Sequence, residues 1–262
     1  MRRLKVLVVF LSFIISFTGS VFALEINSQQ VTITASEDFV SRYIWRGQDL
    51  YGQNDAAHQP SIDVTIDELF ENTDVSFNIW GSFPMSGGHE NGEELDYTIA
   101  FSKDLADSYN LSFGFTYFDF PNTGSTADVS EPWLSLTFNK IPLLPIDISA
   151  NVFAGYDFQA KSGGPDEGWY YSFGFGTEIP LIDSLVTQEG QALSLSMINW
   201  GNDGVADLKP SFVYATDYSI STSYNLGSLS ISPSINYIVN YEDQINSGDC
   251  EFLTGLGFSY AF

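Results

Sequence analysis

The chain has 262 residues, 33 of them acidic and 9 basic, with a formal net charge of −24, yet 44% of it is hydrophobic. Nucleic-acid binding is excluded, because a phosphate backbone is bound by Lys and Arg side chains that release its counterions. The 22 Phe, 14 Tyr and 5 Trp exclude an acidic disordered chain. The single cysteine, Cys250, excludes a disulfide framework and a cysteine-cluster metal site.

Residues 1–23 have the three parts of a secretory signal peptide. Arg2, Arg3 and Lys5 form a cationic start, the stretch from Val6 to Phe17 is apolar, and small residues precede a cleavage point after Ala23. The alternative is a membrane-anchor helix, but the apolar run is shorter than the roughly 20 residues that cross a bilayer. We therefore expect export, and a mature chain that is more acidic still because three basic residues are removed.

The rest of the chain alternates polar and apolar residues with a period of two, which is typical of β-strands. From residue 94 to 101, for example, Leu95, Tyr97 and Ile99 alternate with Asp96 and Thr98. The apolar faces are longer than those of the strands of about 5 to 6 residues in soluble sandwiches. Transmembrane barrel strands need about 9 to 11 residues with apolar-out, polar-in alternation. The sequence therefore predicts an all-β fold, an antiparallel up-and-down transmembrane β-barrel.

We expect a periplasmic N-terminal segment at residues 24–37 and a barrel over residues 38–262, most simply with twelve strands and otherwise with ten or fourteen. The expected strands are residues 38–47, 59–67, 74–83, 94–103, 110–119, 130–139, 146–157, 168–179, 190–200, 211–225, 228–241 and 250–262. An even count places both termini on the periplasmic side. Pro233 must then lie at a bulge or leave one ladder bond unmade, because a closed barrel has no edge strand.

The last expected strand ends the chain on an aromatic residue. Phe258, Tyr260 and Phe262 share one face, and Gly257 and Ser259 lie on the other. A terminal aromatic carboxylate after an alternating strand resembles the signal that outer-membrane barrels present to their assembly machinery. We therefore expect the bacterial outer membrane as location, with membrane lipid, lipopolysaccharide and the barrel-assembly machinery as partners.

Two short motifs lie in the first half of the expected barrel. Residues 41–47 read Ser-Arg-Tyr-Ile-Trp-Arg-Gly, and residues 94–96 read Glu-Leu-Asp after a Trp-Gly-Ser step at residues 80–82. They resemble the Ser-x-Tyr-x-x-Arg-Gly and Glu-Leu-Asp segments of an uncharacterised proteobacterial outer-membrane family, labelled Gcw_chp or TorF-like. The likeness covers residues 38–120, and Arg42 departs from it, since the family often has a small or acidic residue there. The resemblance implies an outer-membrane barrel and no settled activity.

Arg42 and Arg46 lie four residues apart in the first expected strand, so both should point to one face. Tyr43 and Trp45 suit the lipid interface, which would turn the arginines into the lumen. Buried arginines need partners, and the inward carboxylates expected to supply them are Asp63, Glu94, Asp96 and Asp217. Such a lumen charge cluster is either structural or a constriction that selects solutes by charge.

The expected external loops carry many carboxylates. The set comprises Asp49, Asp55, Glu90, Glu93, Asp166, Glu167, Asp203 and Asp207. An acidic mouth would concentrate cations, although a solvated acidic surface is the simpler interpretation. Residues 202–207 lack the closing Glu of a calcium loop. Divalent cations are therefore expected only as loop partners, and neither a resident metal nor a cofactor is predicted.

Together these features favour a pore or channel for the passive passage of small hydrophilic solutes that are neutral or cationic. A barrel of this size has a lumen wider than that of eight strands and narrower than that of a general porin. One alternative is a non-conducting structural or adhesive barrel, closed by inward Phe118, Phe153 and Tyr170. The other, an outer-leaflet hydrolase, would need a base, and His58 and His89 are expected in loops without a nucleophile motif. We therefore predict that the protein is not an enzyme.

Overall fold

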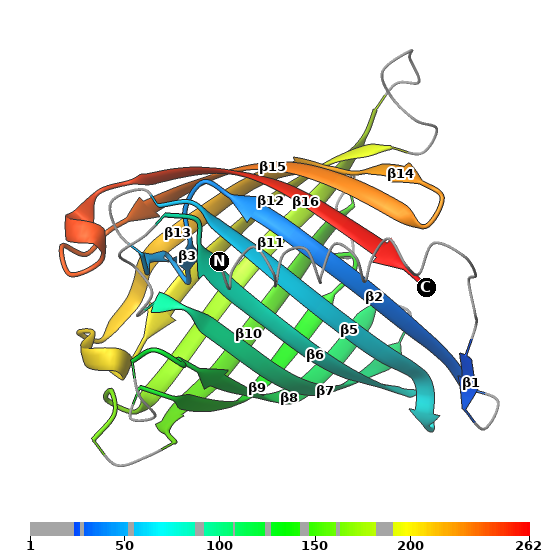
Figure 1. Cartoon of the computed structure of the whole chain (residues 1–262), viewed down its shortest axis with the longest axis horizontal. Helices are drawn as coiled ribbons and strands as arrows, with labels where there is room; N and C mark the ends of the chain where they lie inside the picture. The colour runs from blue at the N-terminus through cyan, green and yellow to red at the C-terminus, as the bar shows by residue number, and fades with distance from the viewer. Residues whose placement is uncertain are drawn as a thin grey trace.

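The computed structural model describes residues 24–26, 29–51, 55–86, 92–106, 108–123, 127–141, 147–160, 163–181 and 191–262. They form a closed antiparallel barrel of twelve strands that follow one another in sequence order, closed where β16 pairs with β2 and β2 with β5 (Figure 1). The barrel strands are β2 (Gln29–Val40), β5 (Ala57–Phe70), β6 (Thr73–Pro84), β7 (Glu94–Ala106), β8 (Tyr109–Asp119), β9 (Val129–Phe138), β10 (Ile148–Gln159), β11 (Gly168–Pro180), β12 (Ala192–Asn202), β13 (Ser211–Thr222), β15 (Leu229–Asn240) and β16 (Glu251–Ala261). The predicted fold class and strand number are confirmed.

Four short strands complete the sheet structure. β1 (Leu24–Ile26) pairs with the start of β2, and β14 (Tyr224–Leu226) pairs with β15. β3 (Ile44–Trp45) and β4 (Gln48–Asp49) form a separate two-stranded hairpin. No helix among the described residues is long and apolar enough to cross a membrane.

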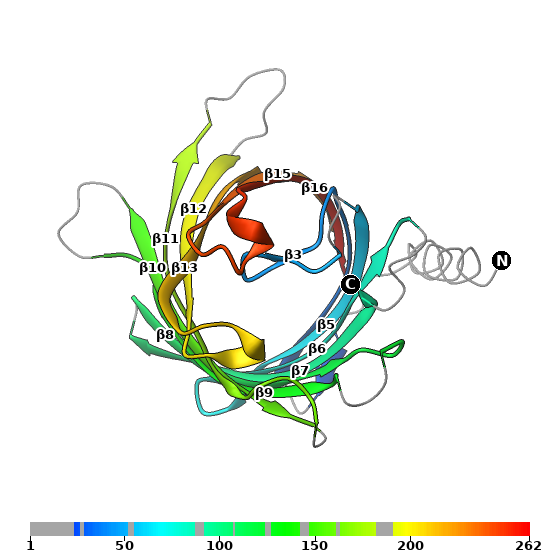
Figure 2. The ribbon, with the colours of Figure 1, turned by 90° about the vertical axis from the view of Figure 1, so that its left-hand side faces the viewer.

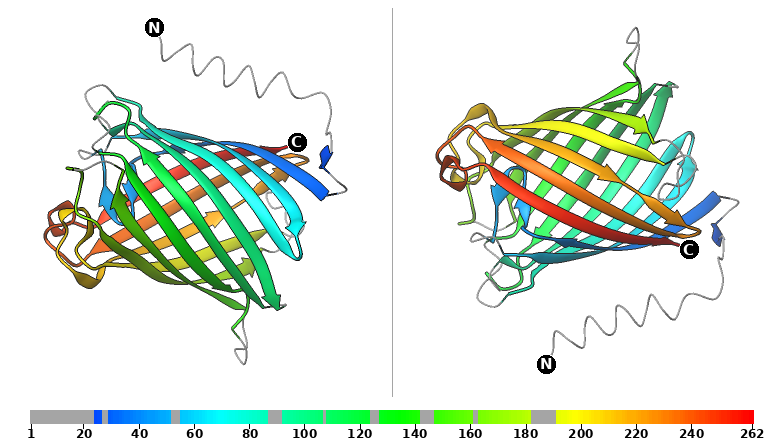
Figure 3. Two further views of the ribbon diagram at one scale, coloured as in Figure 1. Left: turned by 90° about the horizontal axis from the view of Figure 1, so that it is seen from below. Right: turned by 90° about the horizontal axis from the view of Figure 1, so that it is seen from above.

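The two faces of the barrel wall differ as the period-two alternation predicts. The outer face exposes large apolar side chains, among them Phe77, Ile79, Phe113, Leu134, Val152, Phe175, Ile220, Ile235 and Phe252. Register pairs such as Asp63 with Asn78, or Thr98 with Thr116, set polar residues beside each other on the inner face. Exposed apolar surface of this extent requires a nonpolar surrounding, and the tilted strands that carry it are seen in Figure 3.

The first barrel strand begins nine residues earlier than expected. Residues 29–37, predicted as part of a periplasmic segment, form most of β2, and the expected strand at residues 38–47 is wrong beyond Val40. Val31, Ile33 and Ala35 do alternate with threonines and a serine, but the charged Glu37 falls on the outward face and obscures the pattern. The remaining eleven strands match the expected ranges to within a few residues.

Pro233 lies where the neighbouring strand is interrupted. β13 pairs with β15 as far as Ser221 opposite Ser234, and β14 resumes the ladder with Tyr224 opposite Ile231. Ser223 lies in the gap, where its hydroxyl contacts that of Ser232. The proline therefore occupies an irregular point of the ladder, as the closed barrel requires.

The connections sort onto two ends. Residues 41–56, 85–93, 120–128, 160–167, 203–210 and 241–250 all join strands at one end, which we call the loop end. The start of β2 and the end of β16 lie at the other, the terminal end. The connections expected to be external thus all lie at the loop end.

Three segments of the loop end turn inward, over or into the barrel opening (Figure 2). They are the β3–β4 hairpin and the short turns Val205–Asp207 and Asn246–Gly248. A buried apolar cluster joins them, since Val205 and Ile245 pack with Tyr170 and Tyr214 of the wall and with Trp45 of the hairpin. The loop half of the lumen is therefore packed with side chains.

Candidate functional site

The inward hairpin reverses direction at Arg46 and Gly47. Both residues have positive φ angles, 48° and 82°, as a two-residue hairpin turn requires. A side chain at Gly47 would also collide with the wall, because its Cβ would lie 2.6 Å from Cβ of Ala215. The Arg-Gly step of the sequence motif is thus the tip of this hairpin, and the glycine permits both the turn and the close approach.

Hydrogen bonds anchor the hairpin tip to three parts of the molecule. The hydroxyl of Tyr214 donates to the carbonyl of Arg46 at 2.8 Å, and Asn246 Nδ2 donates to the carbonyl of Gly47 at 2.9 Å. The backbone N–H of Asp49 donates to Asn246 Oδ1 at 2.9 Å. Gln48 Nε2 donates to the hydroxyl of Tyr170 at 3.2 Å. The hairpin is therefore held in one position in the barrel.

Arg46 makes a buried ion pair with Glu131 on β9. Its Nη1 lies 2.6 Å from Glu131 Oε2 and its Nη2 donates to Oε1 at 2.8 Å, with the two side chains only 8% and 2% exposed. The guanidinium lies 4.3 Å from the ring centre of Trp45 and 4.6 Å from that of Tyr170. Burial alone lowers the pKa of Arg46, but the adjacent Glu131 raises it, and the net shift is upward. The arginine is therefore charged at all relevant pH values.

Arg42 pairs with Glu251 at the start of β16. The predicted partners Asp63, Glu94, Asp96 and Asp217 are thus wrong as ion-pair partners for both arginines, although Arg46 is close enough to Glu94 and Asp96 to act on them electrostatically. The prediction assumed that residues 42–46 continue a strand, whereas this segment leaves the wall after Val40 and meets other strands. Tyr43 and Trp45 consequently lie inside the barrel, not at the lipid interface.

The two sequence motifs meet in the lumen. The hydroxyl of Tyr43 donates to Glu94 Oε2 at 2.6 Å, and the Tyr43 ring lies 5.7 Å from the ring of Trp80. Nearby, the hydroxyl of Tyr51 donates to Ser82 Oγ at 2.9 Å. Burial and the adjacent Glu94 raise the pKa of Tyr43 well above its ordinary value. The Tyr of the first motif and the Glu of the second therefore form one buried contact between the hairpin and β7.

Further carboxylates line the lumen without a basic partner. Asp63 accepts a hydrogen bond from Asn78 Nδ2 at 2.7 Å, and Asp217 has a buried Oδ1 with no hydrogen-bond partner. Asp38 lies over Gly257, whose Cβ would be 2.3 Å from Asp38 Oδ1. Among the described residues, none of the three makes a salt bridge. The lumen therefore contains more carboxylates than its two arginines can neutralise.

The acidic loop residues mostly accept hydrogen bonds from neighbouring loops and strand ends. Glu93 accepts from Asn122 at 2.6 Å, Asp203 from the N–H of Trp169 at 2.6 Å, and Glu167 from the N–H of Gln159 at 3.3 Å. Asp49 lies in β4, Asp166 is exposed, and Asp55 also has a partner. Glu90 and the side chain of Asp207 lie outside the described residues. Within the described part of the chain, no group of three or more His, Cys, Asp or Glu could hold a metal ion.

His58 lies on β5 and not in a loop as expected. Its Nδ1 is 3.2 Å from Glu37 Oε1, and its ring stacks on Phe83 at 5.2 Å. His58 pairs in register with Phe39 on the outer face, whereas Ser61 belongs to the inner face beside Trp80. The hydroxyl of Ser61 and the ring of His58 therefore lie on opposite faces of the wall, and His89 lies outside the described residues.

Glu131, Asp157 and Glu251 were missed by the sequence analysis. Each is an acidic residue on the inner face of a barrel strand. One signal could have found Glu131: Gly155 lies beside it, and a Cβ there would come within 2.5 Å of the Glu131 carboxylate.

Solved structures share this fold at very low sequence identity. A bacterial polysaccharide outer-membrane secretin matches with a TM-score of 0.53 and 9% sequence identity. The alignment covers 93% of this chain and 99% of the secretin. An outer-membrane channel from Pseudomonas putida F1 has a TM-score of 0.53 and 11% identity, with 93% of this chain and 98% of the channel covered. The NanC porin has a TM-score of 0.50 and 11% identity, with 87% of this chain and 98% of the porin covered. No family model and no curated protein matches the chain. The chain therefore shares the fold of bacterial outer-membrane β-barrels, and its apolar outer face agrees with a membrane-spanning wall.

Proposed function

We propose that the protein is a narrow outer-membrane channel for small hydrophilic solutes, neutral or cationic, with its mouth constricted by the β3–β4 hairpin. The observation that carries this proposal is the charge balance of the lumen. Both inward arginines are already paired with Glu131 and Glu251, whereas Asp38, Asp63 and Asp217 have no basic partner among the residues that the structure describes. Rings of carboxylates favour cations in pores.

The terminal half of the lumen supports passage of polar solutes. Its walls carry small hydroxyl and amide side chains that bond to one another across strands, such as Ser102 with Asn110 and Asn151 with Ser135. Groups of this kind exchange hydrogen bonds with water and with solute hydroxyls at little net cost. The proposed selective element is therefore the loop half, where the hairpin lies.

Planar-bilayer recording of the refolded barrel tests the proposal. Under a KCl gradient the wild type should show single-channel current steps. Its reversal potential should have the sign expected when K⁺ passes more readily than Cl⁻. Asp63→Asn combined with Asp217→Asn should shift that potential toward zero, because two uncompensated charges leave the lumen. The control Glu71→Gln removes an exposed charge from the β5–β6 turn and should change nothing. A correctly folded barrel without conductance at any voltage or salt would overturn the proposal.

A second candidate, a non-conducting structural or adhesive barrel, is favoured by one observation. Phe118 and Tyr170 are buried on the inner face, and Trp45 of the hairpin packs edge-on against both, at 5.9 and 5.2 Å. If this packing closes the mouth, the wild type should be silent while a variant without the hairpin conducts. The same recordings therefore separate the two functions.

Membership of the Gcw_chp or TorF-like family is also part of the proposal. It is supported by the contact between its two motifs, since Tyr43 and Glu94 bond to each other in the lumen. We further propose lipopolysaccharide and the barrel-assembly machinery as partners, on the strength of the apolar outer face and the aromatic C-terminus. Cations held at the acidic loops remain a proposal of the same kind.

A further inference from the structure

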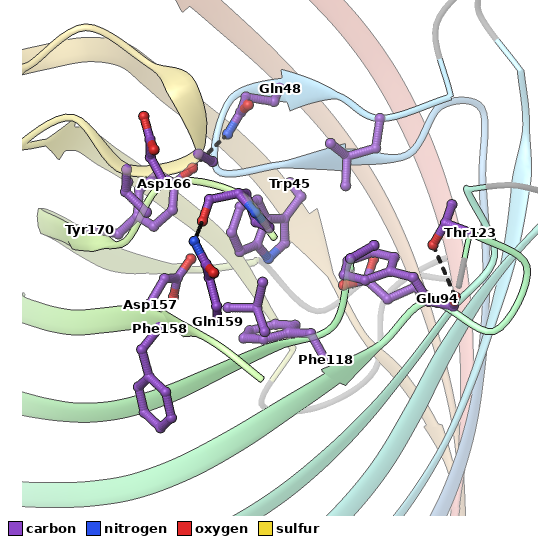
Figure 4. Close-up of a pocket in the computed structure, with 17 residues that line it drawn as sticks. Trp45, Gln48, Glu94, Phe118, Thr123, Asp157, Phe158, Gln159, Asp166 and Tyr170 are labelled. Atoms are coloured by element: carbon purple, nitrogen blue, oxygen red, sulfur yellow. Dashed lines mark hydrogen bonds between the residues drawn. The ribbon is translucent and has the colours of Figure 1, made fainter. Parts of the chain in front are cut away.

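A cavity of about 320 Å³ lies at the loop end, between the inward hairpin and the wall from β7 to β11 (Figure 4). Its surface is almost wholly apolar, with Trp45 and Leu50 on the hairpin side and Phe118 and Val129 on the barrel side. Leu50 is 38% exposed and Asp166 at the rim is exposed, so one side of the cavity lies at the loop surface. A small molecule can therefore reach this apolar space from the loop end.

The polar side chains around the cavity use their hydrogen bonds within the protein. These bonds join Gln48 to the hydroxyl of Tyr170 at 3.2 Å, Thr123 to the carbonyl of Phe120 at 3.0 Å, Gln159 to the carbonyl of Pro165 at 2.9 Å, Tyr43 to Glu94 at 2.6 Å, and Asp157 to Glu131. The exposed Asp166 is hydrated by solvent. The cavity therefore makes little demand for a polar or charged ligand.

Water is a poor occupant of such a space. A buried water molecule typically makes about three hydrogen bonds, and cavities with apolar walls stay dry. Replacing poorly ordered water by an apolar group gains affinity. The hydrophobic effect therefore favours an apolar occupant over solvent.

Packing within the protein holds the apolar walls in place. The ring of Trp45 packs edge-on against Phe118 at 5.9 Å and against Tyr170 at 5.2 Å, and Val205 of a second inward segment belongs to the same buried cluster. An apolar cavity of roughly 150 Å³ binds benzene. The present cavity of about 320 Å³ therefore has room for a molecule of about two rings.

We propose that this cavity binds neutral apolar molecules of one or two rings. The rings would pack against Trp45, Phe118 and Val129. A charged molecule of the same shape would give up its hydration without gaining a partner, which costs free energy. The site goes beyond the proposed channel, because a barrel that conducts no ions could still bind such a molecule from the loop end.

Equilibrium dialysis of radiolabelled naphthalene against the barrel in lipid nanodiscs tests the proposal. Partitioning into the lipid rises linearly with concentration, whereas the cavity should add saturable uptake of one molecule per barrel. The charged analogues 1-naphthoate and 1-naphthylmethylammonium should compete for this uptake at least tenfold more weakly than unlabelled naphthalene does.

Three variants locate the uptake. Val129→Trp fills the cavity from β9 and should abolish the saturable part. Val152→Trp makes the same change at an exposed position on the outer face of β10 and should bind as the wild type does. Ala127→Phe serves if Val129→Trp does not fold, because Ala127 lines the same cavity from outside the barrel strands.

Three outcomes would each overturn the site. They are purely linear uptake by the wild type, competition by a charged analogue as strong as that by naphthalene, and saturable uptake that persists in a folded cavity-filling variant. Because dialysis records no current, the failure of this site and the failure of the channel proposal are distinguishable.

Discussion

At the scale of single residues, the lumen is organised by groups that cannot be buried alone. Arg46 needs a carboxylate, and Glu131 supplies it from a strand 85 residues away in sequence. Aromatic rings then surround the guanidinium from three further strands and from the hairpin itself. A desolvated ion pair of this kind adds little to folding stability compared with an apolar pair of similar volume. Removing only one partner is strongly destabilising, because it leaves the other charge buried and uncompensated.

That asymmetry gives a prediction for Arg46 and Glu131. Glu131→Gln should destabilise the folded barrel by about 3 to 5 kcal/mol, because it leaves the buried guanidinium without its counter-ion. Arg46→Met combined with Glu131→Gln should recover most of the loss. Urea unfolding in lipid vesicles, followed by tryptophan fluorescence, measures each variant. Additive losses in the double variant would contradict a direct pairing.

Tyr43 gives a prediction for alkaline pH. Its pKa is raised by burial and by Glu94, whereas an unfolded tyrosine ionises at about pH 10. Above that pH the unfolded chain loses a proton that folded Tyr43 retains, so its contribution to stability is complete below pH 10 and falls as pH rises further. Tyr43→Phe should lower stability at pH 8, through the lost bond to Glu94, and flatten the decline between pH 9 and 11. Unfolding series at these values measure both effects, and an unchanged slope would contradict the assignment.

At the scale of elements, the β3–β4 hairpin is one of three inward segments that distinguish the loop half of the lumen from the rest. Its sequence has only two strand residues on each side, too few for an independent hairpin. The contacts with Tyr214, Asn246 and Tyr170 hold it in place. The hairpin is therefore stable only because the barrel surrounds it.

Replacing residues 42–50 by a short Gly-Ser linker should leave the barrel folded and raise its single-channel conductance several-fold. The physical reason is that the wall strands pair with one another without the hairpin, whereas the hairpin is part of the proposed constriction. Gly47→Ala keeps every other residue but strains the left-handed turn and presses on Ala215. It should raise conductance less than the replacement does. Equal conductance of all three proteins would show that the hairpin is not the constriction.

At the scale of the whole molecule, closure of the barrel joins the two ends of the chain. β16 pairs with β2, and the backbone N–H of Phe262 donates to the carbonyl of Ile33 at 2.9 Å. The ring of Tyr260 packs edge-on against that of Phe262 at 4.8 Å. The C-terminal aromatic residues therefore lie at the seam where the first and last strands meet.

Phe262→Ala separates folding from assembly. The backbone bond to Ile33 remains, so refolding into detergent should proceed to the same yield as for the wild type. If Phe262 is read by the assembly machinery, the amount of barrel in the outer membrane of expressing cells should fall several-fold. Heat-dependent migration on gels measures the folded fraction in both settings. Wild-type levels in cells would contradict the assembly signal.

The sequence by itself determined the strands, because a wall between lipid and water imposes a period of two on every segment that crosses it. It failed at Glu37, where an outward charge hid the first strand, and at residues 41–51, whose aromatic residues resemble an interface girdle but fold inward. Only the tertiary structure decided that Arg46 meets Glu131, that Arg42 meets Glu251 and that an apolar cavity lies beside the hairpin. Alternation fixes which face a side chain occupies, whereas its partner across the lumen depends on how all twelve strands close.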